Sequence, residues 1–505
     1  MHDGDQWHPQ YPRLSDIGYT RMRGKYSTGL GERRGIELMK TELAIIGAGP
    51  AGITAAIEAS RAGVAVTILD ENPKPGGQIY RQFDEGFSII DADMLGRDYS
   101  RGQELLREFG KVAHKIQYIN HSTVWGIFDD RLAYQDGKKS ATLGFERLII
   151  ATGAYDRPVP FPGWTLPGVI TAGGVQRAVK IHRILPGSKI LLAGTGPLQL
   201  VLADQIISAG GQIEAILEAG NINWFSFLPG IWRQWDTLVD GFRYLRHIWN
   251  AGIPLLRNHI ILEARGDGQV EEADIAEVDK NWRPKLHTRR TLKVDSVCLG
   301  YGLVPSSELA LLAGCEHRYV RELGGWVPLR GEALETSVPG IYAVGDGSGV
   351  AGSKVAIEEG RIAGTAVARS LGRLSITEAQ DRIAIFQKHL SRLKHFCGTL
   401  YEISRPRPGL YELARKDTII CRCEEITLEA IETAMAANAS SLNELKRMTR
   451  SGMGRCQGRI CGPTLFEIMS RKEGSQANEP GAFKPRPPVK PVSLDVLAGN
   501  PTSTS

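Results

Sequence analysis

The sequence lacks long apolar runs. Its 505 residues contain no stretch near the ~18 uninterrupted apolar residues of a membrane-spanning helix. Cysteine is scarce, and seven residues are too few for a disulfide scaffold in a chain of this length. A strong charge of one sign is also missing, because the formal net charge is +5 and the basic residues are spread along the chain. We therefore expect a soluble globular protein without a nucleic-acid partner.

Glycine and the placing of the cysteines are the informative features that are present. The length allows about three domains of roughly 100–200 residues each. Glycine is abundant, with 58 residues, and four of the seven cysteines lie between Cys421 and Cys461. Residues 1–39 have neither an apolar stretch nor a periodicity, so we expect a flexible extension, with Met39 as an alternative start. We expect a bacterial cytoplasmic protein, at most peripheral to the inner membrane.

A glycine-rich turn follows the first apolar strand, Leu43–Ile46. The segment Gly47-Ala48-Gly49-Pro50-Ala51-Gly52 precedes a helical pattern, and a second strand ends on Asp70-Glu71. This order predicts a dinucleotide-binding unit, in which the glycines allow a tight turn, approach of a pyrophosphate and close packing of helix on strand. Asp70 or its neighbour Glu71 would accept hydrogen bonds from a ribose.

A second, less complete turn of this kind begins at Gly194. It reads Gly194-Thr195-Gly196, has Gln199 at the third glycine position, and is followed by a strand ending on Glu218. A side chain at Gln199 should hold the helix farther from the strand. The sequence leaves open whether this site binds NAD, binds another adenine nucleotide or is a structural relic.

Two further segments are typical of a flavin site. A buried strand ends at Thr152-Gly153, and another strand ends at Gly345-Asp346, where a carboxylate could bind a ribitol hydroxyl. A helix starting near Ser353 would direct its positive end toward a flavin. Lys354 at this helix start is a weak candidate for tuning the flavin, and no catalytic acid or base can be named.

Over residues 40–375 the sequence resembles the glutathione-reductase-like flavoproteins. The resemblance implies a discontinuous FAD domain of residues 40–157 and 293–375, interrupted by a second nucleotide-binding domain of residues 158–292. It implies that FAD contacts the following residues: Gly47, Gly49, Pro50, Ala51, Gly52, Asp70, Glu71, Gly77, Gln78, Arg81, Thr152, Gly153, Gly345 and Asp346. The second nucleotide would contact Gly194, Gly196 and Glu218.

A redox-active cysteine pair near the flavin is missing. No Cys-x-x-Cys or similar pair precedes Cys298, which excludes thioredoxin-type disulfide reduction. Cys298, Cys315 and Cys397 are isolated in the sequence and are expected to be small buried hydrophobes.

The four clustered cysteines have the spacing Cys-x-Cys and Cys-x4-Cys. Two amphipathic helices are predicted between the pairs, and four thiolates in such a domain can bind zinc or an iron–sulfur cluster. The segment resembles a bacterioferritin-associated-ferredoxin-type domain, which implies a [2Fe–2S] cluster on Cys421, Cys423, Cys456 and Cys461. Zinc and unmetallated thiols remain alternatives. The expected domain, with its linker, covers residues 376–471.

Two segments have no part in these motifs. Residues 221–250 carry aromatic residues at helical spacing, which indicates a helix packed on the second domain, a docking surface for another protein chain, or a membrane-surface helix. The tail, residues 472–505, is rich in proline and lysine and is expected to be disordered.

The order of the domains resembles the alpha (A) subunits of opine oxidases and of related dye-linked amino-acid dehydrogenases. The segments Gly76–Arg81 and Ala151–Pro158 carry this resemblance, which covers residues 40–470. It implies an α/β fold with two nested Rossmann-like domains and a small helical iron–sulfur domain. It also implies an electron-transfer role, in which the chain receives electrons from an amino-acid-oxidase-like beta subunit, passing them to a respiratory carrier. The alternatives are an NADH-dependent reductase that feeds its own cluster, and a non-enzymatic assembly subunit.

Overall fold

The structure, a computed structural model, describes residues 39–83, 97–137, 139–220, 235–471 and 480–498. The chain divides into a unit of Met1–Met39 and a much larger unit of Lys40–Ser505, which holds the domains. The flexible extension expected for residues 1–39 lies outside the described residues, apart from Met39. Among the helices that the structure describes, none is long and apolar enough to cross a membrane.

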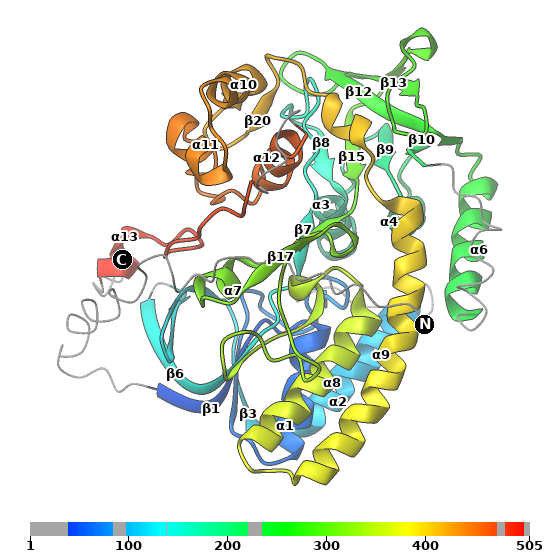
Figure 1. Ribbon diagram of the computed structural model, residues 1–505. Helices are drawn as coiled ribbons and strands as arrows, with labels where there is room; N and C mark the ends of the chain where they lie inside the picture. Colours follow the sequence, from blue (N-terminus) through cyan, green and yellow to red (C-terminus); the bar gives the residue numbers. More distant parts are fainter. Residues whose placement is uncertain (1–38, 84–96, 138, 221–234, 472–479, 499–505) are drawn as a thin grey trace, which may run out of the picture. The chain divides into compact units, whose positions relative to one another are not determined.

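The first domain is built on a seven-stranded sheet with the order β3-β2-β1-β6-β5-β4, in which β19 also pairs with β6 (Figure 1). Strand β2 pairs in parallel with both β1 and β3, whereas β4, β5 and β6 are antiparallel. Strand β19 is far along the chain, so the sheet is built from two separate stretches of sequence. The strands are β1 Met39–Ile46, β2 Val66–Leu69, β3 Ile116–Ile119, β4 Ser122–Phe128, β5 Arg131–Asp136, β6 Lys139–Ile150 and β19 Ile341–Ala343.

Four helices accompany this sheet: α1 Pro50–Arg61, α2 Arg97–Val112, α8 Ser353–Ser370 and α9 Ile376–Ser404. Figure 1 shows α8 beside α1, with α9 running along α8. Helices α1 and α8 approach closely because Gly364 has no side chain: a Cβ there would lie 2.4 Å from the carbonyl oxygen of Ala55. Helix α9 begins with a capping box, in which Ser375 and Glu378 exchange hydrogen bonds.

The second domain contains a parallel five-stranded sheet with the order β11-β10-β9-β15-β8. Its strands are rich in buried aliphatic residues, as is usual for parallel sheets covered on both faces. A separate antiparallel sheet has the order β12-β13-β14. The elements are β8 Val169–Thr171, α3 Ala172–Arg177, the π-helix η5 Ala178–His182, β9 Ile190–Gly194, α4 Pro197–Ser208, β10 Ile213–Glu218, α6 Trp235–Asn250, β11 Leu255–Arg257, β12 His259–Arg265, β13 Glu272–Glu277, β14 Arg290–Lys293 and β15 Ser296–Gly300.

The boundary expected at residue 293 is wrong, because β15 pairs with β8 and β9 inside the second domain. Close packing holds β15 there: a Cβ on Gly194 would lie 2.2 Å from the carbonyl oxygen of Gly300. The chain leaves the first domain at β7 (Ala154–Asp156) and returns at β16 (Leu303–Pro305). These two strands pair antiparallel, so the two crossings lie side by side.

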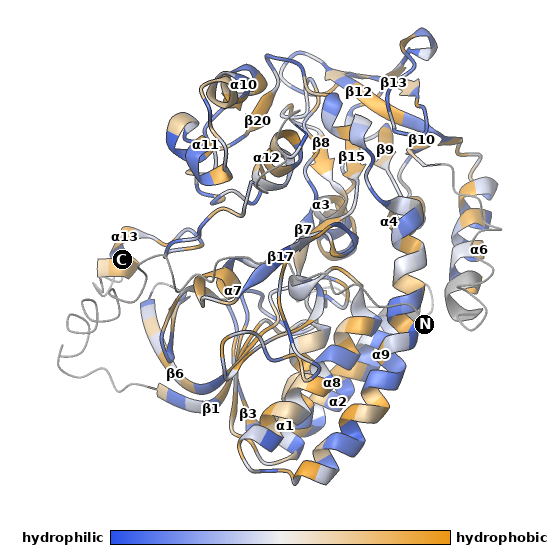
Figure 2. Ribbon diagram, viewed as in Figure 1, coloured by the Kyte–Doolittle hydropathy of each residue, from blue (hydrophilic) through white to orange (hydrophobic). Residues whose placement is uncertain are grey.

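Helix α6 covers only part of the aromatic segment expected at 221–250, and residues 221–234 lie outside the described residues. Ile248 is buried where α6 packs near α4, but the side chains of Phe242 and Trp249 are 71% and 83% exposed. Figure 2 shows hydrophobic and hydrophilic residues mixed around this helix. The helix therefore packs on the second domain through one side and leaves several aromatic residues in solvent.

The C-terminal domain packs its helices around buried cysteines and aliphatic residues. The two helices expected between the cysteine pairs are present as α10 and α11. The domain contacts a hairpin of β17 (His317–Val320) and β18 (Gly325–Pro328) through stacked rings of Tyr319 and Phe466, whose centroids are 3.9 Å apart. Its elements are β20 Ile419–Cys421, β21 Ile426–Thr427, α10 Leu428–Ala436, α11 Leu442–Thr449 and α12 Gly462–Met469.

Residues 480–498 belong to the tail that was expected to be disordered, but they form hydrogen bonds with other parts of the chain. The N–H of Leu442 donates to the carbonyl of Pro480, and the N–H of Val489 donates to the carbonyl of Trp125 in β4. A short helix, α13 (Leu494–Ala498), follows. Proline-rich chain has few internal hydrogen bonds, but neighbouring elements can satisfy its backbone groups. We call residues 480–490 the C-terminal segment.

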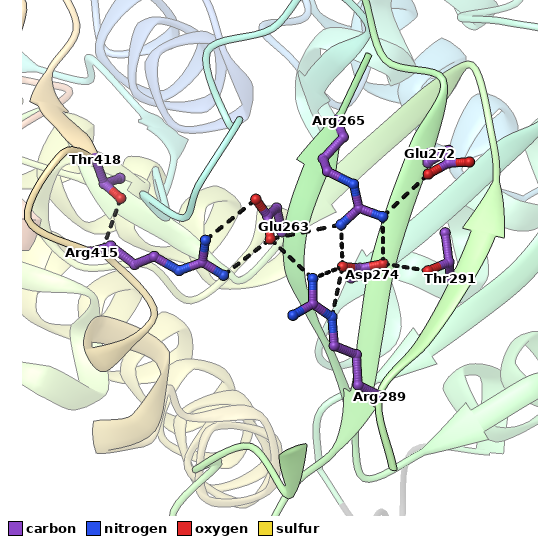
Figure 3. Close-up of polar contacts among 8 residues, drawn as sticks. All are labelled: Glu263, Arg265, Glu272, Asp274, Arg289, Thr291, Arg415 and Thr418. Atoms are coloured by element: carbon purple, nitrogen blue, oxygen red, sulfur yellow. Dashed lines mark hydrogen bonds and ion pairs between the residues drawn. The ribbon is translucent and has the colours of Figure 1, made fainter. Parts of the chain in front are cut away.

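A network of ion pairs joins the β12–β13–β14 sheet to the linker before the C-terminal domain (Figure 3). Asp274 is buried and accepts hydrogen bonds from Arg265, Arg289 and Thr291. Glu263 on β12 pairs with Arg415 at 3.0 Å. Burial alone would raise the pKa of Asp274. The hydrogen bonds from Arg265, Thr291 and Arg289 outweigh burial and lower this pKa to about 2.

Candidate functional site

The first glycine-rich turn opens onto a large cavity between the first and second domains. The cavity has a volume of about 1290 Å³, above the roughly 300–1,000 Å³ of pockets for drug-sized ligands. All residues expected to contact FAD line it, except Gly52 and Arg81. Lys354, the weak candidate for tuning a flavin, is not among the lining residues. The structure thus brings most of the predicted FAD contacts together at one cavity, although they are far apart in the sequence.

The turn itself requires glycine at two of its three glycine positions. Gly47 has φ of +102°, and a Cβ on Gly52 would lie 1.9 Å from the carbonyl oxygen of Gly47. A Cβ on Gly49 would meet nothing closer than Cα of Gly77, at 3.8 Å, so Gly49 faces open space. An elongated anion can approach the backbone at Gly49, while Gly47 and Gly52 hold the turn against the helix.

The two acids after β2 have different surroundings. Asp70 is 6% exposed, and its Oδ2 accepts from the N–H of Ala48 at 2.5 Å while Oδ1 accepts from Asn72. Glu71 is half exposed, and its Oε2 lies 2.5 Å from Nζ of Lys490. Arg81 does not line the cavity. It donates to Oδ1 of Asn72 at 2.8 Å and so stabilises the chain that follows β2.

At the other end of the cavity, polar groups fix the strand ends. Thr152 donates from Oγ1 to the carbonyl of Ser306, and Oδ1 of Asp346 accepts from the N–H groups of Ala351 and Gly352. Burial raises the pKa of Asp346. Helix α8 begins at Ser353, so its positive end faces this part of the cavity. These groups fit the ribitol and ring system of a flavin.

A buried ion pair supports Gly345. Glu359 accepts from the N–H of Gly345 at 2.9 Å and pairs with Arg330 at 2.9 Å. Burial alone would raise the pKa of Glu359, but Arg330 and Lys394 lower it, so the carboxylate stays ionised. The sequence motifs did not point to Glu359 or Arg330.

The second glycine-rich turn has a different environment. Gly194 and Gly196 do not line the cavity, and a Cβ on Gly196 would lie 2.9 Å from Cβ of Ser404, at the end of α9. Glu218 is 4% exposed, and it accepts from Oγ1 of Thr195 and from the N–H groups of Gly196 and Gly220. Burial raises the pKa of Glu218. Helix α9 therefore lies where a pyrophosphate would approach a complete turn.

Gln199 replaces the third glycine of this turn, and it is buried between α4 and β10. Its Nε2 donates to the carbonyl of Leu217 at 3.1 Å. The side chain thus bonds the helix to the strand, a role that its position in the motif did not predict.

The four clustered cysteines meet in two pairs, Cys421 with Cys461 and Cys423 with Cys456. A hydrogen bond from the Cys461 thiol and the backbone N–H groups of Gly452, Glu424 and Cys423 lower the pKa of Cys421 to about 6, against the effect of burial. Among the described residues, no three side chains of His, Cys, Asp or Glu converge as a formed metal site. The donor set of four sulfurs with amides directed at them nevertheless fits a thiolate-bound metal.

Glycines around the second cysteine pair serve more than one purpose. A Cβ on Gly454 would lie 2.3 Å from Cβ of Cys423, so Gly454 gives room to a cysteine. Gly452, Gly458 and Gly462 instead face the ring of Phe483 in the C-terminal segment.

Arg459 links the cysteine loop, residues 456–461, to the cavity. Its Nε lies 3.0 Å from Oε1 of Glu308, and both side chains line the cavity. Tyr155 lines it as well, and burial, with Glu308 nearby, raises its pKa. Sequence reasoning missed these three residues. The position of Arg459 between two cysteines was visible, but its partner is far away in the chain.

The comparisons with known proteins agree with this arrangement. The chain matches the Pyridine nucleotide-disulphide oxidoreductase family over residues 41–372 and the Sarcosine oxidase A3 domain over residues 415–500. The A subunit of opine oxidase from Rhizobium meliloti is 36% identical over 472 residues, which are 91% of this chain and 88% of that protein. The chain belongs to the family of opine oxidase A subunits. It is therefore an FAD-dependent oxidoreductase.

Two other proteins are similar to this chain. Hydrogen cyanide synthase subunit HcnB of Pseudomonas aeruginosa is 34% identical over 462 residues, 90% of this chain and 97% of that protein. The crystal structure of L-proline dehydrogenase from P. horikoshii has a TM-score of 0.67 and 22% identity, and the match covers 93% of this chain and 82% of that one. The proline dehydrogenase shows the shared fold, and the sequence relatives show the family of opine oxidase A subunits.

Proposed function

We propose that this chain is the electron-transfer subunit of a hetero-oligomeric opine or amino-acid dehydrogenase, and that it binds FAD and a [2Fe–2S] cluster. The observation that carries the proposal is the ion pair between Arg459 and Glu308. It places the cysteine loop at the wall of the cavity that the FAD motifs line. When bound, the flavin would exchange electrons in pairs or singly and the cluster would carry one electron at a time.

The residues of the chain position these groups. Gly49 and the start of α1 would bind the pyrophosphate, Asp70 or Glu71 the ribose, and Asp346 the ribitol. Cys421, Cys423, Cys456 and Cys461 would hold the cluster. Tyr155, Glu308 and Arg459 lie between the two sites, where they line both the cavity and a smaller pocket beside the cysteine loop.

The electrons would come from a partner. The relatives are named as subunits, which supports a multi-subunit complex for this chain, and we infer that the partner is an amino-acid-oxidase-like beta subunit. Oxidation of an amine to an imine removes two electrons and two protons. The partner would release the protons, and the electrons would pass through this chain to a one-electron acceptor such as a respiratory carrier. Octopine, nopaline, proline and glycine are candidate amines.

The alternative is an NADH-dependent reductase, in which the second turn binds NADH. The strand, turn and helix of a dinucleotide unit are present there. Two features favour the electron-transfer role instead. Ser404 lies against Gly196, and the carboxylate of Glu218 already accepts hydrogen bonds from Thr195 and from the backbone N–H groups of Gly196 and Gly220. A purely structural role is set aside because the family consists of oxidoreductases.

Anaerobic mixing separates these functions. The purified chain, loaded with FAD, should keep its flavin absorbance when NADH is added. With the copurified partner and an opine or amino acid, the flavin absorbance should bleach. Dithionite serves as the control, since it should bleach the flavin in every sample. Rapid bleaching by NADH would support the reductase, and oxidation of octopine by the chain alone would contradict the division of labour.

A further inference from the structure

The C-terminal segment reaches the cavity at the end that the first glycine-rich turn forms. Lys490 lines the cavity, and its Nζ lies 2.5 Å from Oε2 of Glu71, a residue 419 positions earlier in the chain. In a dinucleotide-binding unit, the acid at the end of the second strand lies beside the adenosine ribose. Lys490 therefore brings a positive charge to the adenosine end of the site.

The backbone immediately before Lys490 is held in place. The N–H of Val489 donates to the carbonyl of Trp125 at 2.9 Å, and the carbonyl of Val489 accepts from Nη2 of Arg459 at 2.8 Å. Both backbone groups of the residue before Lys490 are thus satisfied. These bonds fix the backbone from which the side chain of Lys490 extends toward Glu71.

The same segment contacts the cysteine loop. The ring of Phe483 lies against Gly458, where a Cβ would come within 2.5 Å of the ring, and against Gly452 and Gly462. The N–H of Lys484 donates to Oδ1 of Asn443 in α11. One short stretch therefore contacts both the cysteine loop and the wall of the cavity.

The C-terminal domain thus supplies two cations to a cavity made by the other two domains. Lys490 faces Glu71, and Arg459 faces Glu308. An ammonium group has three N–H donors, so Lys490 can pair with Glu71 and also donate to a ribose oxygen beside this carboxylate. Charge-assisted hydrogen bonds of this kind are among the stronger polar contacts in proteins.

We propose that the C-terminal domain completes the dinucleotide site, with Lys490 as a binding residue at the adenosine end. Dinucleotide binding and docking of the C-terminal segment then stabilise each other, since coupling between two binding equilibria is reciprocal. This inference rests on the proposed binding of FAD in the cavity. It assigns a ligand-binding role to a residue outside every sequence motif of the site.

The first test measures FAD binding to the full chain after removal of the flavin, by quenching of flavin fluorescence. Lys490→Ala should raise the Kd about tenfold, the effect of losing one hydrogen bond to a charged group. Lys484→Ala is the matched control, because Lys484 belongs to the same segment but does not line the cavity, and its Kd should match the wild type. Lys490→Arg keeps the charge and should restore most of the affinity.

The second test measures hydrogen–deuterium exchange of the C-terminal segment with and without FAD. FAD should slow exchange at Val489 in the wild type and much less in Lys490→Ala. A Kd for Lys490→Ala equal to the wild type, or exchange at Val489 unaffected by FAD, would overturn the inference while leaving the proposed function intact. A wild-type chain that binds no FAD would overturn both.

Discussion

Two adjacent carboxylates at the end of β2 show how far neighbouring residues can differ. Asp70 is buried and bonded to the turn that it follows, whereas Glu71 is half exposed and meets Lys490. The sequence could name both as ribose ligands but could not separate them. The difference depends on a lysine near the other end of the chain, and no local pattern gives that pairing.

The buried cysteines make a residue-scale prediction possible. Cys421 and Cys298 are 1% and 2% exposed, but only Cys421 has other cysteines around it. Cys421→Ala should abolish iron binding and the absorbance of a cluster, because one of four ligands is lost. Cys298→Ala should keep both. Iron analysis and absorption spectra of the two variants check this expectation.

Burial raises the pKa of Cys298 to about 12, so this thiol remains protonated and unreactive at neutral pH. The two alanine variants thus compare Cys421, a buried cysteine proposed to bind the cluster, with Cys298, a buried cysteine that has no such role. Zinc in place of iron in the wild-type protein would contradict the cluster, and equal iron content in both variants would contradict the ligand assignment.

At the scale of elements, the sequence located strands and helices better than it assigned them to sheets. The boundary at residue 293 put β15 in the wrong domain. Only the pairing of β15 with β8 and β9 settles that question. Proline-rich composition likewise predicted disorder for the C-terminal segment, because its stabilising partners lie in other domains and composition does not reveal them.

The β12–β13–β14 sheet gives a prediction at this scale. Asp274→Asn should lower the free energy of unfolding by roughly 2 kcal/mol at pH 7, since one pKa unit corresponds to about 1.4 kcal/mol. Glu272→Gln is the control: Glu272 pairs with the same arginine but is 40% exposed, and surface pairs contribute about 0–1 kcal/mol. Thermal unfolding of both variants measures the difference.

The pH dependence of this effect has a defined sign. The pKa of Asp274 is depressed in the folded protein, from 3.8 to about 2. Its contribution is therefore complete above the unfolded value and is lost as pH falls toward 2. The gap in unfolding temperature between wild type and Asp274→Asn should be constant from about pH 8 to 5 and shrink below about pH 4. A gap that widens with acid would contradict the ion-pair explanation.

For the whole molecule, motifs and resemblance predicted the nested domains, and most of the residues that they predicted to contact FAD line one cavity. They did not predict how the C-terminal domain docks, because Tyr319, Trp326 and Arg459 belong to no motif. Their positions follow from packing between surfaces that are distant in sequence. The contact with the β17–β18 hairpin is aromatic, with Trp326 lying edge-on to Phe466.

This docking can be weakened from the side of the hairpin. Tyr319→Ala removes the stacking on Phe466 and the hydrogen bond to Glu467 at 3.0 Å, and should cost about 2–3 kcal/mol. Limited proteolysis of the linker near residue 415 should then be faster, while flavin and iron are retained. Tyr319→Phe keeps the ring and should cost about 1 kcal/mol. Equal cleavage rates for Tyr319→Ala and wild type would contradict the docking role.

Helix α9 has a mechanical consequence. It has 29 residues, about 44 Å at 1.5 Å per residue, and it packs on α8 in the first domain before its last residue meets Gly196 in the second. Two neighbouring crossing strands, β7 and β16, would by themselves act as a hinge. Helix α9 contacts both domains at points away from β7 and β16, so it resists rotation of one domain about these strands. The cavity wall is thereby braced, so a ligand that enters the cavity meets a site of fixed shape.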